Sequence, residues 1–421
     1  MTSLPQTQVF PTSLEEMEGL LHALEASADS VLAFDGQNFR DHEAQLFLES
    51  SAVQFLATWT GSLNGRLRIS PRENEPPVDA LKRMSDTLPG ALIGMLDEQA
   101  WIEMPKAALA KFKDAFFKQQ RSWPDLDAQD QAALICQDNI PAGIGLPPQL
   151  YPAAKAGAVA DRDHFRLLVD QLIASVTDEA NIRGAISSRR EQLTTILHEL
   201  FKNTHDHARL TTDGKPLSFS IRGTYARFYS SAQLEYTGAA PQKDEQGRDI
   251  LSGLDQAERF ASYFTRDRVQ QHNRLIQAEE RQFLGLLELS VFDTGPGFAA
   301  TYLKKKFGGA SVQQQFEAVL GCFATGRSTT GDESRGYGLW KVLRDLRELK
   351  GFIRVRTNKV HVYRDFAWYE NMFLQEKKGG ATAPEERMMD WRRGITRRIT
   401  EGYPDMQGAH VAVLIPLGEH L

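Results

Sequence analysis

Cysteine is scarce in this chain, and long apolar runs are missing. Two cysteines, Cys136 and Cys322, occur in 421 residues, too few for a disulfide framework or a cysteine-based metal site. No stretch approaches the roughly 18 apolar residues that a membrane-spanning helix needs, and the first residues lack the basic and apolar segments of a signal peptide. Neither positive nor negative charge dominates: the chain has 49 Lys and Arg against 55 Asp and Glu, a formal net charge of −6. We therefore expect a cytoplasmic protein without a membrane partner, and nucleic acid is disfavoured except at a local basic patch.

The remaining composition is that of an ordinary globular protein, 41% hydrophobic and 25% charged, with a length typical of two or three domains. Apolar periodicity near the start predicts helix, strand, helix and strand over 12–27, 31–34, 41–60 and 67–69. This order resembles the small α/β module of STAS-like domains. Proline and glycine cluster over 140–158 and predict a domain boundary there. We therefore expect an N-terminal α/β module over 1–145 and a second domain over 158–421.

The first of three motifs lies in a helix predicted over 187–208. Its apolar face is formed by Leu193, Ile196, Leu197 and Leu200. Glu199 and Asn203 are four residues apart, so they lie on one face of that helix. A carboxylate there can polarise a water molecule, and an amide oxygen can bind Mg²⁺. Taken alone, this spacing is also common on solvated helix faces.

The second motif follows a strand predicted over 286–292, where the chain continues as Asp293-Thr294-Gly295-Pro296-Gly297. The glycines allow the backbone to approach a planar ligand, and the Asp293 carboxylate can accept a hydrogen bond from an exocyclic amine such as that of adenine. Asp and Gly are also the usual residues of a simple turn. This motif therefore indicates a nucleotide site only in combination with the first and third motifs.

The third motif, Gly336-Tyr337-Gly338-Leu339, opens a helix predicted to run to Lys350. Free backbone N–H groups and the positive end of the helix dipole make such a start suitable for phosphate. Between the second and third motifs, residues 299–335 are rich in glycine, serine and threonine. This composition predicts a loop that orders only when a phosphate contacts it.

In this order, the three motifs resemble the N, G1 and G2 boxes of the GHKL (Bergerat-fold) ATPases, the superfamily of gyrase, heat-shock chaperones, MutL and histidine kinases. The loop that ends at Gly336 is similar to the ATP lid of that family, and 408–416 is similar to its final strand. The resemblance covers about 160–421. It implies a two-layer α/β sandwich, with a mixed sheet covered by helices on one face, and ATP and Mg²⁺ as ligands.

The resemblance also implies residue roles. Glu199 would be the general base for the attacking water, Asn203 the Mg²⁺ ligand and Asp293 the acceptor for adenine. Asp206 and His207, one turn beyond Asn203, would lie near the nucleotide. The residues expected to make room for the base or to surround the phosphates are Gly295, Gly297, Gly326, Arg327, Ser328, Thr329, Gly336, Gly338 and Leu339.

Two features depart from the family. Ala409 stands where a threonine usually supports the adenine-binding aspartate, which implies weaker binding of the base. Asn203 and Asp293 are separated by 90 residues, so we expect an insertion over about 210–285, helical and polar in its second part. A basic stretch over 387–398 has apolar residues at helical spacing and predicts an amphipathic surface helix, with nucleic-acid contact as the minority interpretation.

Three function classes remain open at this stage. The first is an ATP-gated regulatory or assembly ATPase that acts through a protein partner or a second copy of the chain. The second is a protein kinase of the anti-sigma or histidine-kinase type. The third is a nucleotide-sensing module without turnover. Histidines His198, His205 and His207 also lie close together in the sequence, but we interpret them as ordinary helix residues because no cysteine or acidic cluster completes a metal site.

Overall fold

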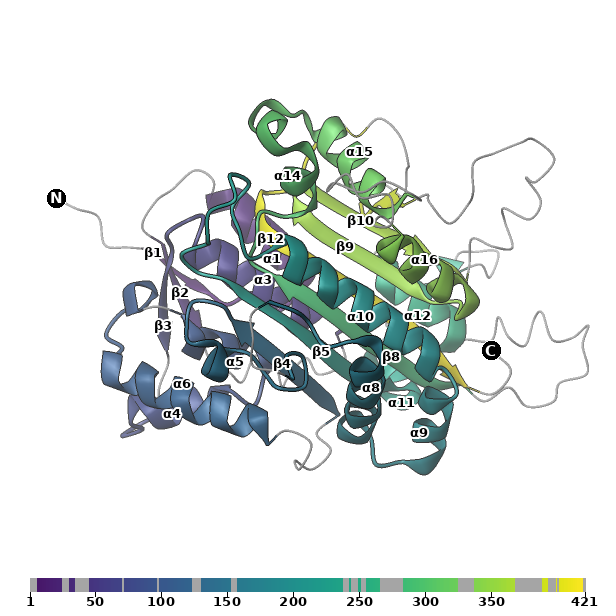
Figure 1. The fold of residues 1–421 in the computed structure, drawn as a ribbon, viewed down its shortest axis with the longest axis horizontal. Coiled ribbons are helices and arrows are strands. Elements are labelled where there is room, and N and C mark those ends of the chain that lie inside the picture. The colour runs from purple at the N-terminus through teal and green to yellow at the C-terminus, as the bar shows by residue number, and fades with distance from the viewer. Residues whose placement is uncertain are drawn as a thin grey trace, which may run out of the picture.

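The computed structural model shows an α/β architecture built on one large sheet (Figure 1). It describes residues 6–24, 30–34, 45–69, 72–96, 98–122, 130–152, 157–237, 242–243, 249–250, 255–265, 283–324, 337–367, 388–392, 399 and 401–418. Within these residues no helix is both long enough and apolar enough to cross a membrane.

The large sheet has seven strands in the order β11-β10-β9-β12-β8-β5-β4. Every neighbouring pair is antiparallel, whereas we expected a mixed sheet. The strands are β4 (Gln131–Gln137), β5 (Ile221–Ser230), β8 (Phe283–Asp293), β9 (Phe352–Asn358), β10 (Val360–Asp365), β11 (Met389–Asp390) and β12 (Met406–Gly418).

One face of this sheet is covered by helices from residues 162–348, with α8, α10 and α16 lying across it in Figure 1. These helices are α8 (Arg162–Val176), α9 (Ala180–Ser187), α10 (Arg190–His207), α14 (Phe298–Leu303), η3 (Lys304–Gly309), α15 (Val312–Phe323) and α16 (Gly338–Glu348). Alternate side chains of β8 (Leu287, Leu289 and Val291) pack into the core beneath them, as the period of a strand requires. The predicted α/β sandwich is confirmed.

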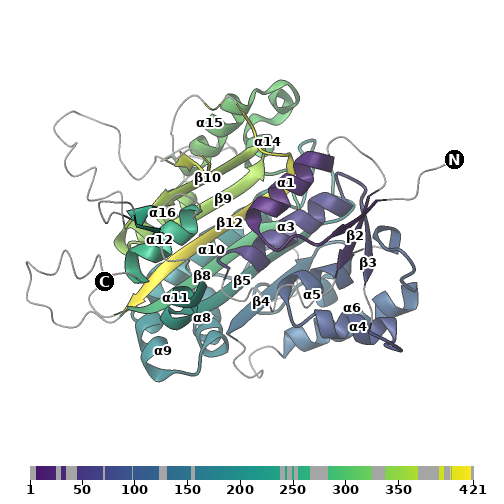
Figure 2. The ribbon, with the colours of Figure 1, turned by 180° about the vertical axis from the view of Figure 1, so that it is seen from behind.

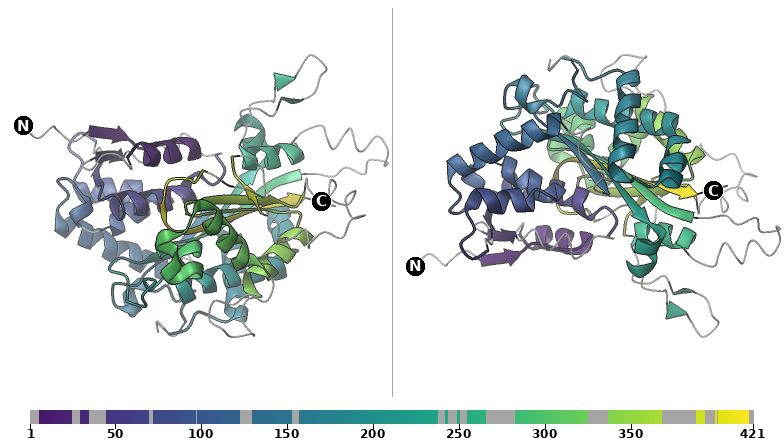
Figure 3. Two further views of the ribbon diagram at one scale, coloured as in Figure 1. Left: turned by 90° about the horizontal axis from the view of Figure 1, so that it is seen from above. Right: turned by 90° about the horizontal axis from the view of Figure 1, so that it is seen from below.

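The N-terminal module lies on the second face of the sheet (Figures 2 and 3). It contains a parallel sheet in the order β1-β2-β3. Its elements are β1 (Gln6–Val9), α1 (Leu14–Leu24), β2 (Ser30–Phe34), α3 (Leu48–Thr60), β3 (Arg66–Ile69), α4 (Pro77–Met84), α5 (Leu88–Met95), η1 (Glu98–Ala100) and α6 (Lys106–Arg121). Apolar residues of α3, including Phe55, join Tyr225 and Phe292 of the large sheet in one buried cluster. The sheet is therefore covered on both faces, not on one.

The large sheet extends across the boundary that we placed over 140–158. β4 precedes this segment and pairs with β5 as the edge strand; the short helix α7 (Ala142–Gly145) follows. The expected insertion over 210–285 likewise begins with β5, which pairs with β8 inside the sheet. Its remaining elements are α11 (Ser231–Thr237), β6 (Gln242–Lys243), β7 (Asp249–Ile250) and α12 (Gln256–Thr265).

The prediction of an amphipathic helix over 387–398 is wrong for its first part. Met389 and Asp390 form β11, which pairs with β10, and Trp391 stacks on His361 at a centroid distance of 4.5 Å. Residues 393–398 lie outside the described part of the chain. Met388 and Met389 are both buried, in two different core clusters, as successive residues of a strand can be and as residues on one face of a surface helix cannot.

Candidate functional site

Helix α10 carries the first motif and runs along the helical face of the sheet. Its apolar residues Leu193, Ile196, Leu197 and Leu200 are buried, as their spacing predicts. Glu199 and Asn203 are partly exposed, and the Glu199 side chain retains 17% of its accessible surface. The helix was predicted over 187–208 and is observed over Arg190–His207.

The third motif lies directly against Glu199. A Cβ atom added to Gly338 would lie 2.6 Å from Glu199 Oε2, so any other residue at this position would displace the Glu199 carboxylate. Three residues later, Lys341 Nζ donates to Glu199 Oε1 at 3.4 Å. Leu339 is buried in the core between the two helices. The sequence did not single out Lys341, although it follows Gly338 by one turn on the same helix.

The second motif ends β8, where Asp293 is 5% exposed. Arg222 of β5 and Ala409 of β12 are its partners in the neighbouring strands. Asp293 Oδ1 accepts hydrogen bonds from the backbone N–H groups of Gly295 at 2.9 Å and Ala409 at 3.2 Å. Burial raises the pKa of the Asp293 carboxyl to about 6, although these two hydrogen bonds and the nearby Arg222 lower it. Ala409 has no side-chain hydroxyl, but it supports Asp293 through its backbone N–H.

The two glycines of this turn are both fixed by close neighbours. A Cβ on Gly295 would lie 2.5 Å from Ala208 Cα, at the end of α10, and Gly297 has φ +85°. Beyond the turn, Thr357 Oγ1 accepts a hydrogen bond from Phe298 N at 3.0 Å, and Asn358 Nδ2 donates to Pro296 O at 2.9 Å. The sequence did not identify this pair at the end of β9.

The three motifs therefore meet along one helix. The third lies at Glu199 and the second at Ala208, nine residues later, about 13 Å along the axis at 1.5 Å per residue. Of the other candidate residues, Asp206 is exposed and His207 is half-buried. The remaining candidates lie outside the described residues: Gly326, Arg327, Ser328, Thr329 and Gly336.

A buried polar network supports the Asp293 end of this helix. Arg222, which is fully buried, donates two hydrogen bonds to Asp138, at 2.8 and 2.6 Å, and one to Tyr151 Oη at 2.7 Å. Tyr151 Oη in turn lies 2.9 Å from His205 Nδ1. Burial and the Arg222 charge lower the pKa of His205 to about 4. His205 is thus a neutral partner of this network at neutral pH.

No family model, curated protein or solved structure matches this chain. Within the described residues, His, Cys, Asp and Glu side chains nowhere gather in threes as a metal-binding group. The groups of the site that can act chemically are the side chains and backbone described above. These are a carboxylate beside a lysine and a glycine-opened helix at one end, and a buried carboxylate within a glycine turn at the other.

We predict that Gly297→Ala destabilises the protein by about 1–3 kcal/mol. The reason is that the new Cβ would need a left-handed φ and would lie 2.6 Å from both Asn358 Oδ1 and Thr357 Oγ1. Gly308→Ala is the matched control, since no atom lies within 4 Å of its added Cβ. Urea-induced unfolding measures the free energy of unfolding of both variants. Equal unfolding free energies for the two variants would contradict the tight support of this turn.

Proposed function

We propose that this chain binds ATP with Mg²⁺ as a GHKL-type ATPase and acts as an ATP-gated regulatory or assembly switch. The observation that carries the proposal is the convergence on helix α10 of three motifs that lie far apart in the sequence. Gly338 lies against Glu199, and Gly295 lies against Ala208 of the same segment. A nucleotide with its base at Asp293 and its phosphates at α16 would lie along this helix.

The described residues fit such a ligand in three ways. Asp293 presents a carboxylate whose Oδ1 is held by two backbone donors, so its orientation is set before adenine binds. Gly295 and Gly338 let the turn and the start of α16 lie close to α10, since a Cβ there would lie 2.5 Å from Ala208 Cα or 2.6 Å from Glu199 Oε2. Lys341, with 43% of its side chain exposed, can move from Glu199 to a phosphate oxygen, because lysine carries its charge on a flexible stem.

The roles then divide between the two ends of α10. Glu199 takes a proton from the attacking water, and Lys341 next to it supplies positive charge where negative charge develops. The amide of Asn203, one turn beyond, is the Mg²⁺ ligand that this chain offers, and the metal neutralises phosphate charge when bound. The prediction of a loop over 299–335 is wrong for its first part, which forms α14, η3 and α15. In this proposal the rest of that segment, which lies outside the described residues, completes the phosphate site.

We also propose a cytoplasmic setting and a protein partner or a second copy of the chain as the target. Cys136 and Cys322 are both free thiols, which suits a reducing compartment. One fold hosts many functions, so in this proposal the partner determines what ATP binding controls.

Chromatography of γ-labelled ATP after incubation with the full chain separates the three function classes. We expect label in free phosphate at a rate that depends on Mg²⁺. Label on protein would instead favour the kinase alternative. Unchanged ATP, with binding retained, would favour a sensing module without turnover.

A further inference from the structure

The glycine turn of the second motif is not supported by packing on its reverse side. A cavity of about 370 Å³ lies there, lined by Gly295 and Pro296, by Leu21 and Leu63 of the N-terminal module, and by 404–407. Because apolar neighbours do not fill this space, individual polar contacts help to fix the turn on this side. One of these is a hydrogen bond from Gln407 Nε2 to Thr294 O at 3.1 Å.

Gln407 lies in a β-bulge. Met406 pairs with Asn358 and Ala409 with Thr357, so Gln407 and Gly408 are extra residues on β12. Gly408 has φ +75°, and a Cβ there would lie 1.8 Å from Asp293 O. Bulges redirect side chains and are frequent beside functional sites. This bulge directs the Gln407 amide at the carbonyl that immediately follows Asp293.

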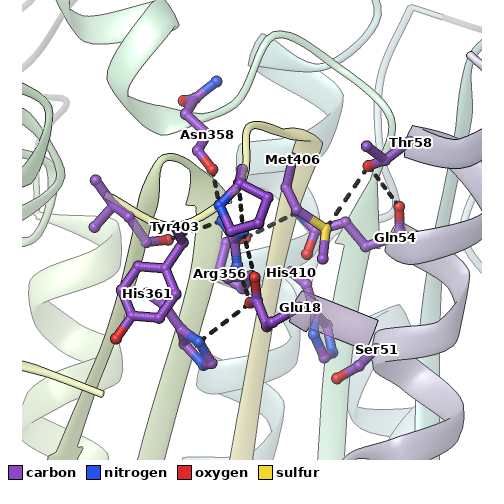
Figure 4. Close-up of polar contacts among 12 residues, drawn as sticks. Glu18, Ser51, Gln54, Thr58, Arg356, Asn358, His361, Tyr403, Met406 and His410 are labelled. Carbon is purple, nitrogen blue, oxygen red and sulfur yellow. Dashed lines mark hydrogen bonds and ion pairs between the residues drawn. The ribbon is translucent and has the colours of Figure 1, made fainter. Parts of the chain in front are cut away.

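Helix α3 of the N-terminal module holds both backbone groups of Gln407. Gln407 N donates to Thr58 Oγ1 at 3.0 Å, and Gln54 Nε2 donates to Gln407 O at 3.3 Å. Figure 4 shows Gln54 and Thr58 facing Met406 at the start of β12. Just after the helix, a Cβ on Gly61 would lie 2.3 Å from Gln407 Oε1. The module therefore determines where Gln407 can lie.

Helix α1 is also linked to this turn, through Arg356 and Asn358. Arg356, whose side chain is fully buried, donates to Glu18 Oε1 at 2.6 Å and to Asn358 O at 2.5 Å, and Figure 4 shows this chain of contacts. Burial alone would raise the pKa of Glu18, but Arg356 and His361 hold it well below its usual range. Since Asn358 also holds Pro296, both module helices contact residues that support the turn.

We propose that Gln407 is a positioning residue, through which helix α3 of the N-terminal module holds the base-binding turn in the conformation that accepts ATP. This inference rests on the proposed function. Coupling free energies are reciprocal, so the module affects nucleotide affinity and the nucleotide stabilises the docked module. A partner that displaces α3 would thereby weaken ATP binding.

The test compares steady-state hydrolysis of MgATP by the wild type and by Gln407→Met, which keeps the length of the side chain and removes its donor. We expect KM to rise about 3–10-fold, the range of one neutral hydrogen bond, with kcat unchanged because Glu199 is not affected. Gly61→Ala, which pushes on Gln407 from the module side, should raise KM in the same way. An unchanged KM in both variants would overturn the inference.

A control separates positioning from general loss of stability. Thr87→Ala removes the N-cap of α5, where Thr87 Oγ1 accepts from Gly90 N at 3.3 Å, and should lower the melting temperature without changing KM. Hydrogen exchange gives the reciprocal readout: MgATP should slow exchange over Leu48–Thr60 in the wild type and not in Gln407→Met. If the wild type binds no ATP, the proposed function fails; if it binds and α3 shows no response, only this inference fails.

Discussion

Glu199→Gln should bind ATP at least as tightly as the wild type and hydrolyse it about 10²–10⁴ times more slowly. The amide has the size of the carboxylate, so the contacts with Gly338 and the hydrogen bond from Lys341 can persist. It cannot accept a proton from water, however. The substitution also removes the repulsion between the Glu199 carboxylate and the phosphates, so ATP binding should not weaken. Single-turnover rates and nucleotide affinity, measured on the same preparation, separate the two effects.

The matched control for this variant is Glu191→Gln, two turns earlier on α10. Glu191 is exposed and paired with Arg162 and Arg166, so the substitution removes the same charge from the same helix. It should leave the hydrolysis rate unchanged. Hydrolysis at the wild-type rate by Glu199→Gln would mean that another group activates the water.

Asp293→Asn should weaken ATP binding by about 10–100-fold, the range of a hydrogen bond to a charged group. Asp293 Oδ1 accepts from Gly295 N and Ala409 N. The amide oxygen of an asparagine would therefore face these donors, and its NH₂ group would face the exocyclic amine of adenine. Two donors would then oppose each other where a donor and an acceptor are needed.

The same variant should stabilise the nucleotide-free protein at neutral and alkaline pH. Burial raises the folded-state pKa of Asp293 from 3.8 to about 6, so the contribution of this group to stability is complete below about pH 4 and is lost as the pH rises through 6. Above pH 7 the asparagine variant should gain up to about 3 kcal/mol over the wild type. Below pH 4 the difference should vanish, as thermal unfolding across this range will show. A pH-independent difference would contradict the raised pKa.

If Asp293 is retained in order to bind a ligand, its replacement should weaken ligand binding and raise the stability of the free protein. A buried carboxylate without a full set of partners lowers stability, and functional sites often retain such strain. If Asp293→Asn lowered both stability and affinity in parallel at pH 8, Asp293 would be a structural residue of the turn and not a contact of the base.

The elements that carry the motifs could be predicted from the sequence, because their signals are local. The apolar stripe of α10, the β8 run before Asp293 and the glycine start of α16 each lie within a few residues of the motif they position. Helix boundaries agree within three residues for α10. Local periodicity therefore gives the layer of helices and the strands beside it.

The packing of the N-terminal module on the second face of the large sheet could not be predicted from local periodicity. Glu288 alternates with leucines along β8, a pattern that favours a sheet with one face toward water. Instead Glu288 is fully buried, and it accepts hydrogen bonds from Ser50 of the N-terminal module at 2.7 Å and from Tyr229 at 2.7 Å. The buried partner lies 238 residues away, beyond any local pattern.

The same limit applies to the site. Lys341, Thr357 and Asn358 contact the motifs through tertiary structure, and Gln407 does so through a bulge that no composition signal marks. The boundary over 140–158 failed to divide the fold because proline and glycine report local turns, whereas β4 joins the sheet by pairing with β5. The sequence therefore predicted the groups that we propose to contact a nucleotide, but not the residues that hold these groups in place.

The most direct measurement of the central claim is a calorimetric titration of MgATP into the full wild-type chain at pH 7.5, repeated with Asp293→Asn. The account predicts one ATP per chain with saturable heat in the wild type, and a dissociation constant about 10–100-fold higher in the variant. Guanosine triphosphate should bind more weakly than ATP, because its base offers a carbonyl where adenine offers an amine. No saturable heat with ATP, or equal affinities in the two chains, would contradict the claim.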